Sequence, residues 1–174
     1  VSYGIVMEKD VKTVVVIGLG YVGLPLITEF SKYFKVFGFD TSEDRVQQLN
    51  SGLDITKEVS TESLLQSING RHAEFTHDES LIRGKDFYII CVPTPVDERF
   101  EPDLTSVKLA SELVGRVIQK GGTVVYESTV YPGATEEECI PIVAKNSSLL
   151  PSHDFYFGYS PERINPGDKS SSIR

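Results

Sequence analysis

The sequence predicts an α/β fold built on a doubly wound, mainly parallel sheet with helices on both faces. Apolar segments rich in β-branched residues, such as 11–18 and 86–92, have the composition of strands that are buried on both faces. Segments with helical periodicity alternate with them, which is typical of parallel strands joined by crossover helices. With 174 residues, the chain is long enough to form one domain with a substantial core.

The predicted elements follow one another regularly along the chain. The predicted strands cover residues 11–18, 35–40, 86–92, 121–129 and 154–160. The predicted helices cover residues 24–33, 41–52, 59–68 and 102–118, and a further helix begins near Thr135. In the segment 102–118, one helical stripe is apolar and should face the core: Leu104, Val107, Ala110, Val114, Val117 and Ile118.

Polar residues and glycine mark the ends of these helices. Thr41 or Ser42 should cap the helix over 41–52, which Gly52 should end. Ser60 and Asp103 are the expected N-caps of the two helices that follow.

The segment "TEEE", residues 135–138, has the pattern of a capping box, with Thr135 as N-cap and Glu138 as its partner. Its three glutamates would lie in the first turn of the helix, where the helix dipole favours negative charge. We therefore expect them to serve as cap and solvent-facing surface and not in catalysis.

Composition and charge exclude several functions. The chain has 17 basic and 25 acidic residues and a formal net charge of -8, which argues against a nucleic acid or an anionic membrane as partner. No apolar run approaches the roughly 18 residues that a membrane-spanning helix needs. Residues 1–10 lack the pattern of a signal peptide and are expected to be a leader outside the domain; Met7 within it suggests that the leader was added in cloning.

Two cysteines, Cys91 and Cys139, are too few for a disulfide framework. Apolar residues flank both, so a buried small side chain is the expected state of each, and neither has a histidine nearby in the sequence to activate it as a nucleophile. Cysteine usage therefore favours a reducing, cytoplasmic compartment.

A glycine motif directly follows the first predicted strand. Gly18, Gly20 and Gly23 form the pattern G-x-G-x-x-G between an apolar strand and a helix, the context that a Rossmann-type dinucleotide site requires. Gly18 allows the tight turn, Gly20 lets a pyrophosphate approach the backbone, and Gly23 lets the helix pack on the strand. The N–H groups of Tyr21 and Val22 would then receive the phosphates.

The acidic residue expected about 20 positions after the motif is Asp40, at the end of the second strand. Its carboxylate would accept hydrogen bonds from a ribose 2′-OH and repel a 2′-phosphate, so the sequence predicts NAD rather than NADP. Arg45 has three open interpretations: a phosphate contact, a side chain along the adenosine, or a solvated helix residue.

Small hydroxyl side chains follow two later strands. Thr94 lies after the strand at 86–92, and Ser128 and Thr129 end the strand at 121–129. Because the carboxyl ends of parallel strands meet at one edge of the sheet, these residues should complete the crevice and hydrogen-bond a ribose or the nicotinamide amide.

Four segments together identify a family: "IGLGYVGLPL", "CVPTP…PDL", "VVYESTVYPGATEEE" and "YSPERINPGD". From about Lys12 to Asp168 the chain resembles the UDP-glucose/GDP-mannose dehydrogenase family, and most of all its branch that acts on UDP-N-acetylhexosamines in capsule, O-antigen and Vi-type polysaccharide synthesis. UDP-glucose enzymes of the family tend to carry a second acid where this chain has Pro166, so that acid's cofactor contact is not transferred.

The resemblance implies oxidation of the C6 alcohol of a nucleotide sugar to a carboxylate, with two NAD⁺ and a cysteine-bound thioester. It implies no metal. The implied NAD-binding residues are Gly18, Gly20, Tyr21, Val22, Asp40, Arg45, Thr94 and Thr129. Glu162, held between Pro161 and Pro166, would handle protons or water during thioester hydrolysis, and Thr129 would assist at the same centre; the role of Arg163 stays open.

The family's nucleophilic cysteine lies on a later part of its chains, and neither Cys91 nor Cys139 corresponds to it. We therefore expect residues 11–168 to be the NAD-binding domain of a longer enzyme, and 169–174 to begin a linker towards a central helix and a UDP-binding domain. The full-length enzyme would bind a UDP-sugar and form a homodimer.

Two alternatives share the glycine motif and Asp40. One is the NAD-binding domain of a different dehydrogenase, of the β-hydroxyacid type, which would use a lysine on a following helical domain. The other is a non-catalytic NAD-sensing module, which gives no reason for Glu162 between prolines.

Overall fold

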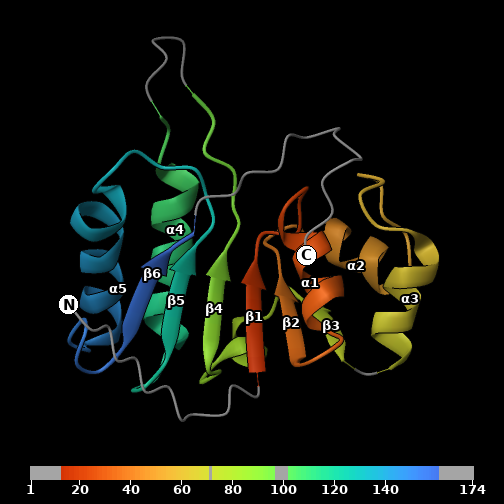
Figure 1. Ribbon diagram of the computed structural model, residues 1–174, viewed down its shortest axis with the longest axis horizontal. Coiled ribbons are helices and arrows are strands. Elements are labelled where there is room, and N and C mark those ends of the chain that lie inside the picture. The colour runs from red at the N-terminus through yellow and green to blue at the C-terminus, as the bar shows by residue number, and fades with distance from the viewer. Residues whose placement is uncertain (1–12, 71, 97–101, 161–174) are drawn as a thin grey trace, which may run out of the picture.

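The computed structural model describes residues 13–70, 72–96 and 102–160, and within these ranges the chain forms one six-stranded sheet (Figure 1). The strands are β1 (Thr13–Ile17), β2 (Lys35–Phe39), β3 (Ala73–Thr76), β4 (Phe87–Ile90), β5 (Thr123–Tyr126) and β6 (Tyr156–Tyr159). Their order is β3-β2-β1-β4-β5-β6, and every neighbouring pair is parallel. This is the order of a dinucleotide-binding Rossmann sheet, so the predicted fold class is confirmed.

Helices cover both faces of the sheet. They are α1 (Gly23–Phe30), α2 (Glu43–Asn50), α3 (Thr61–Asn69), the 3₁₀ helix η1 (Glu79–Ile82), α4 (Thr105–Val117), the π-helical turn η2 (Thr135–Cys139) and α5 (Ile140–Ser147). Apolar residues of α1, α2 and α3 pack on one face, and those of η1, α4 and α5 pack on the other. Among the described residues, no helix combines the length and the apolar character needed to cross a bilayer.

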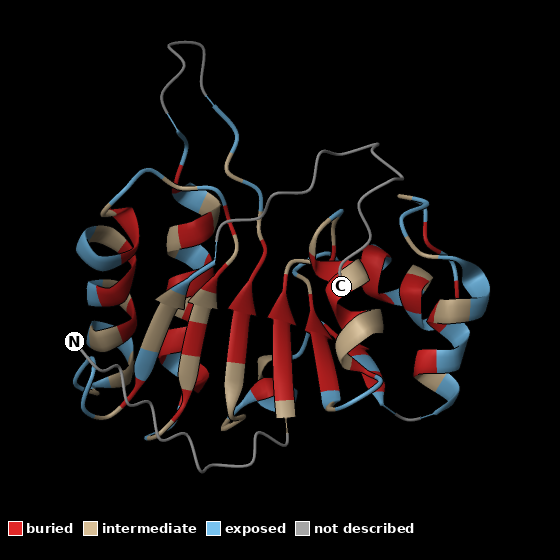
Figure 2. Ribbon diagram, viewed as in Figure 1, coloured by how far each residue is buried: buried red, intermediate tan, exposed pale blue. Residues whose placement is uncertain are grey.

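The pleat of β1 explains the two separate cores. Val14 and Val16 belong to the core beneath α1, whereas Val15 and Ile17 belong to the core beneath α4. All four side chains are buried, because successive residues of a central strand point to opposite covered faces. Figure 2 shows burial concentrated along the central strands, while the edge strand β6 is only partly covered.

Several predicted helix ends are confirmed. The Ser42 side chain caps α2 by accepting a hydrogen bond from the Arg45 N–H, and Ser60 caps α3 by accepting one from the Ser63 N–H. Gly52 follows α2 with a φ of 82°, in the left-handed region that favours glycine. The apolar stripe of α4 is buried as predicted.

Two predicted caps are wrong. Thr135 is buried inside the π-helical turn η2, whose N-cap is Ala134, and the capping box with Glu138 does not form. Glu138 instead forms an ion pair with Lys108 of α4, with 2.7 Å between Nζ and Oε2. The N-cap position of α4 is Leu104, although the preceding Asp103 still accepts a hydrogen bond from the Thr105 N–H at 2.9 Å.

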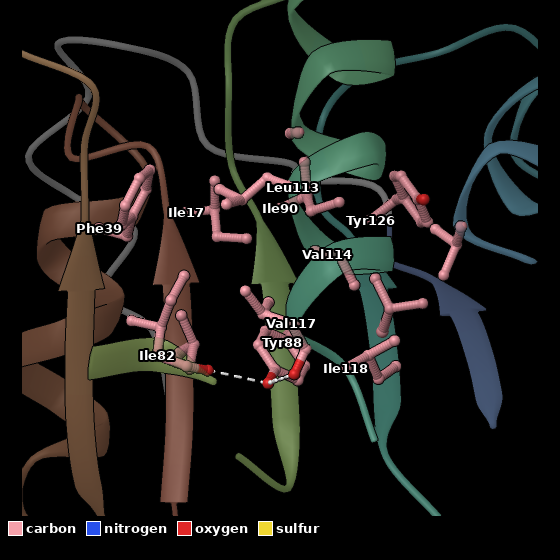
Figure 3. Close-up of a cluster of buried hydrophobic side chains, with 14 of the residues drawn as sticks. Ile17, Phe39, Ile82, Tyr88, Ile90, Leu113, Val114, Val117, Ile118 and Tyr126 are labelled. Carbon is pink, nitrogen blue, oxygen red and sulfur yellow. Dashed lines mark hydrogen bonds between the residues drawn. The ribbon is translucent and has the colours of Figure 1, made fainter. Parts of the chain in front are cut away.

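A buried tyrosine, Tyr88, forms hydrogen bonds in the core beneath α4 (Figure 3). The Tyr88 hydroxyl oxygen lies 2.9 Å from the Ile82 carbonyl oxygen and 3.2 Å from that of Val117, and it accepts a hydrogen bond from the Lys85 N–H at 3.0 Å. Burial raises the pKa of Tyr88 to about 12. The hydroxyl thus joins η1, β4 and the end of α4.

Candidate functional site

The candidate site lies where the carboxyl ends of β1, β2 and β4 meet (Figure 1). Strand order reverses between β1 and β4, and open α/β sheets form their binding crevice at such a point. A cavity of about 450 Å³ opens there, lined among others by Gly18, Asp40 and Val92. The structure therefore brings the glycine turn and the predicted ribose carboxylate to the same cavity.

The space that a side chain would enter differs among the three glycines. Gly18 has a φ of 96°, and a Cβ there would lie 3.0 Å from the Cys91 carbonyl oxygen. A Cβ on Gly23 would lie 1.9 Å from the Gly18 carbonyl oxygen, so only glycine lets α1 begin so close to the turn. A Cβ on Gly20 would meet no atom of the chain within 4 Å. The space over Gly20 fits the close approach of a ligand phosphate.

Tyr21 and Val22 lie directly before α1, which begins at Gly23. The Gly20 carbonyl accepts the first helical hydrogen bond, from the Leu24 N–H at 3.2 Å. The N–H groups at this position belong to the first turn of the helix and are the donors that helix N-termini offer to phosphates. The Tyr21 side chain is exposed and Val22 packs partly against the core.

Asp40 is anchored to the glycine turn. Its Oδ2 accepts a hydrogen bond from the Leu19 N–H and its Oδ1 accepts one from the Ser42 N–H, both at 2.9 Å. A carboxylate has about four acceptor positions, so these two contacts leave capacity for the hydroxyls of a ribose. Asp40 is half-buried and lines the cavity.

Arg45 is not a solvated helix residue, and that interpretation is wrong. The side chain is buried, its Nε donates to the Leu19 carbonyl at 2.9 Å, and its Nη2 forms an ion pair with Asp54 at 2.9 Å. Arg45 therefore contacts the glycine turn through the Leu19 carbonyl. A direct contact with phosphate or adenosine stays a prediction.

Thr94, Ser128 and Thr129 join the loops that follow β4 and β5. The Thr94 hydroxyl donates to the Thr129 carbonyl at 2.6 Å, and the buried Ser128 hydroxyl donates to the Val92 carbonyl at 2.6 Å. The Thr129 side chain lies at the surface. The three residues do lie together at the carboxyl edge of the sheet, but the hydroxyls of Thr94 and Ser128 fasten one loop to the other.

Sequence reasoning missed one wall of the cavity, which is formed by η1 and α4. Glu79 and Arg116 both line it and form a two-bonded ion pair, with distances of 2.7 Å and 3.1 Å. A hydrogen bond from Arg116 lowers the pKa of Glu79. No prediction was made for η1, whereas Arg116 lay within a predicted helix and was not recognised as part of the site.

Glu162, Arg163 and the prolines around them lie outside the described residues, so the role of Glu162 stays a prediction. Cys91 and Cys139 are both buried, and burial raises the pKa of the Cys139 thiol, which disfavours the nucleophilic thiolate. Within the described ranges, no three residues of His, Cys, Asp or Glu are grouped so that they would hold a metal ion.

Comparison with known proteins identifies the family. The model of the UDP-glucose/GDP-mannose dehydrogenase family, NAD binding domain, matches residues 12–173. The chain belongs to this family. It is an NAD-binding domain of these dehydrogenases, and the β-hydroxyacid dehydrogenase alternative is thereby set aside.

Relatives of this family support the assignment. The chain is 51% identical to a UDP-N-acetyl-D-glucosamine 6-dehydrogenase of Salmonella typhi, over 94% of this chain and 38% of the relative. It is 51% identical to Protein CapL of Staphylococcus aureus, over 91% of this chain and 36% of the relative. The solved structure of a UDP-D-ManNAc dehydrogenase from Pyrococcus horikoshii superimposes with a TM-score of 0.84 and 31% identity, over 89% of this chain and 37% of that one. The chain thus spans well under half the length of these family members.

Proposed function

We propose that this NAD-binding domain serves a nucleotide-sugar 6-dehydrogenase, a longer protein that oxidises the C6 alcohol of a UDP-N-acetylhexosamine, or of UDP-glucose, to the uronic acid. The overall reaction converts the alcohol, one water and two NAD⁺ into the carboxylate, two NADH and three protons. The observation that carries the proposal is the cavity that Gly18 of the glycine turn and Asp40 line together, with open space over Gly20 of the same turn. The 51% identity to a UDP-N-acetyl-D-glucosamine 6-dehydrogenase supports the choice of substrate.

Different residues of the chain would bind different parts of NAD. Gly20, Tyr21 and Val22 would present backbone N–H groups to the pyrophosphate, and Asp40 would accept the adenosine ribose hydroxyls. When bound, NAD⁺ supplies the hydride acceptor for each oxidation step. Thr129, in the loop that follows β5, would face the end of the crevice where the reaction takes place.

The catalytic part of the proposal extends beyond the described residues. Glu162 would act as the carboxylate that moves protons or positions water while a thioester is hydrolysed, and the cysteine of that thioester would lie on a later segment. We also propose the division into a leader (1–10), the NAD-binding domain (11–168) and the start of a linker (169–174), a homodimeric full-length protein, a cytoplasmic location and a role in polysaccharide synthesis.

The decisive experiment compares the 174-residue chain with a longer protein that includes the segment after Arg174. NADH formation is followed at 340 nm with NAD⁺ and, in turn, UDP-N-acetylglucosamine, UDP-N-acetylgalactosamine, UDP-N-acetylmannosamine and UDP-glucose. We expect turnover only by the longer protein, with two NADH per sugar. A UDP-sugar-dependent rate from the short chain would contradict the division of the site. A longer protein that binds NAD⁺ but oxidises none of the sugars would favour the NAD-sensing alternative.

A further inference from the structure

A buried ion pair, between Arg45 and Asp54, contacts the glycine turn through the Leu19 carbonyl. The side chains of Arg45 and Asp54 are 10% and 1% exposed, and 2.9 Å separates Nη2 from Oδ1. Burying two charges costs more desolvation energy than most such pairs recover, and an apolar pair of similar size often stabilises a fold as well or better. Stability alone therefore gives little reason to keep these charges next to the glycine turn.

Asp54 is saturated with hydrogen bonds. Besides Arg45, its carboxylate accepts bonds from the Thr56 N–H at 3.0 Å, the Thr56 hydroxyl at 2.7 Å, the Glu58 N–H at 3.0 Å and the Val59 N–H at 3.1 Å. Burial by itself raises the pKa of Asp54, but the bonds from Thr56, Val59 and Arg45 outweigh it and hold the pKa below its usual value. The carboxylate is a fixed, ionised anchor.

Arg45 connects Asp54 to the glycine turn. While Nη2 binds Asp54, Nε donates to the Leu19 carbonyl at 2.9 Å. The planar guanidinium presents these donors in a rigid fork, so fixing one donor also directs the other. Among the described residues, Nη1 is buried and has no hydrogen-bond partner, so Nε and Nη2 make the contacts that fix the guanidinium.

The Leu19 carbonyl belongs to the peptide that also carries the Gly20 N–H. The described chain has no cis peptide, and in a planar trans peptide the C=O and N–H point in opposite directions. Arg45 holds the carbonyl on one side, and Asp40 holds the preceding Leu19 N–H at 2.9 Å. Arg45 therefore sets the orientation of the Gly20 N–H, which points away from the Arg45 side of this peptide.

We propose that Asp54 is a positioning residue for dinucleotide binding: through Arg45 it fixes the Leu19–Gly20 peptide and so preorganises the turn that receives the pyrophosphate. Asp54 acts through Arg45 and need not touch the ligand. The proposal rests on the NAD site described above. It assigns to the loop after α2 a function that no sequence motif indicated.

The test uses purified protein containing this chain and three ligands that share adenosine: NAD⁺, ADP and adenosine. Dissociation constants are measured by calorimetry, or by NMR titration for adenosine. Asp54→Asn should weaken NAD⁺ and ADP at least tenfold and change adenosine less than twofold, because only the first two ligands carry the pyrophosphate. Thr56→Val is the matched control: it removes one bond to Asp54, leaves the Arg45 pair intact and should change all three constants less than twofold.

A second variant keeps the proposal testable if Asp54→Asn does not fold. The double substitution Arg45→Met with Asp54→Leu deletes both charges, so it should keep the melting temperature close to that of the wild type while losing the hold on the Leu19 carbonyl. It should show the same selective loss for NAD⁺ and ADP. A folded double variant that binds both ligands as the wild type does would overturn the role of Asp54. Wild-type protein that bound neither ligand would instead overturn the NAD site itself.

Discussion

Replacing Gly20 with alanine should separate ligand binding from folding. The added methyl group would contact no atom of the chain within 4 Å, and Gly20 does not adopt a positive φ, so the backbone tolerates a side chain. The free energy of unfolding should change by less than about 0.5 kcal/mol, as for other surface positions without special contacts. The methyl group would, however, occupy the space through which a pyrophosphate reaches the turn.

The loss of affinity follows from the hydrogen bonds at stake. Displacing the pyrophosphate would forfeit at least one charge-assisted bond to a backbone N–H, worth about 1.5–3 kcal/mol. That free energy corresponds to a roughly ten- to hundredfold rise in the dissociation constant for NAD⁺. Calorimetric titration with NAD⁺ measures the affinity, and urea denaturation followed by circular dichroism measures stability.

Gly23→Ala is the comparison that makes the result interpretable. Its methyl group would lie 1.9 Å from the Gly18 carbonyl oxygen, so the turn must move by about 1 Å or more, and overpacking of this kind typically costs about 1–3 kcal/mol of stability. Gly23→Ala should therefore damage folding and binding together. If Gly20→Ala bound NAD⁺ as tightly as the wild type, or lost as much stability as Gly23→Ala, the assignment of the turn to the pyrophosphate would be refuted.

Three further predictions follow from other parts of the structure. Burial raises the pKa of Tyr88 from about 10 to about 12, so its protonated form contributes stability that is complete below pH 10 and is lost as pH rises towards 12, on the order of 3 kcal/mol in all. In urea denaturation at stepped pH, Tyr88→Phe should lose stability less steeply over that window than the wild type, and equal slopes would contradict this. Asp40→Ser should reduce the preference for NAD⁺ over NADP⁺ at least tenfold in paired titrations, since the charge that repels a 2′-phosphate is gone; an unchanged ratio would argue against Asp40 as the ribose ligand. In a longer, active protein, Glu162→Gln should lower kcat about 10²–10⁴-fold while the dissociation constant for NAD⁺ stays within twofold; unchanged turnover would exclude Glu162 as the hydrolytic carboxylate.

The sheet was predictable because its strands are strongly patterned. Continuous β-branched runs such as "TVVVI" in β1 indicate burial on both faces, and the glycine spacing after β1 identifies the strand-to-helix turn. Strand β3 and helix η1 were not predicted. Each spans four residues, and the sequence "AEFT" of β3 has no extended apolar run that distinguishes it from a loop.

The candidate site was predictable where backbone conformation restricts the residue type and not where the contacts are long-range. Gly18 and Gly23 are fixed by steric conflicts that a sequence motif records. The partnership of Arg45 with Asp54 depends on a loop that folds back on α2, and a single arginine on a polar helix is equally compatible with solvent. Likewise, the "TEEE" segment has the residues of a capping box, but packing of η2 against α4 buries Thr135 and draws Glu138 to Lys108.

The strand order also determines how much of the chain must be synthesised before the glycine turn after β1 can form. β1 is made first among the described strands, yet it lies in the middle of the sheet and needs both β2 and β4 as neighbours. The turn after β1 is closed by two backbone bonds, from the Gly18 N–H to the Phe39 carbonyl and from the Cys91 N–H to the Ile17 carbonyl. A ribosome must therefore have released residues well past Cys91 before this turn is complete, and until then the apolar strand β1 is exposed to chaperones and to aggregation.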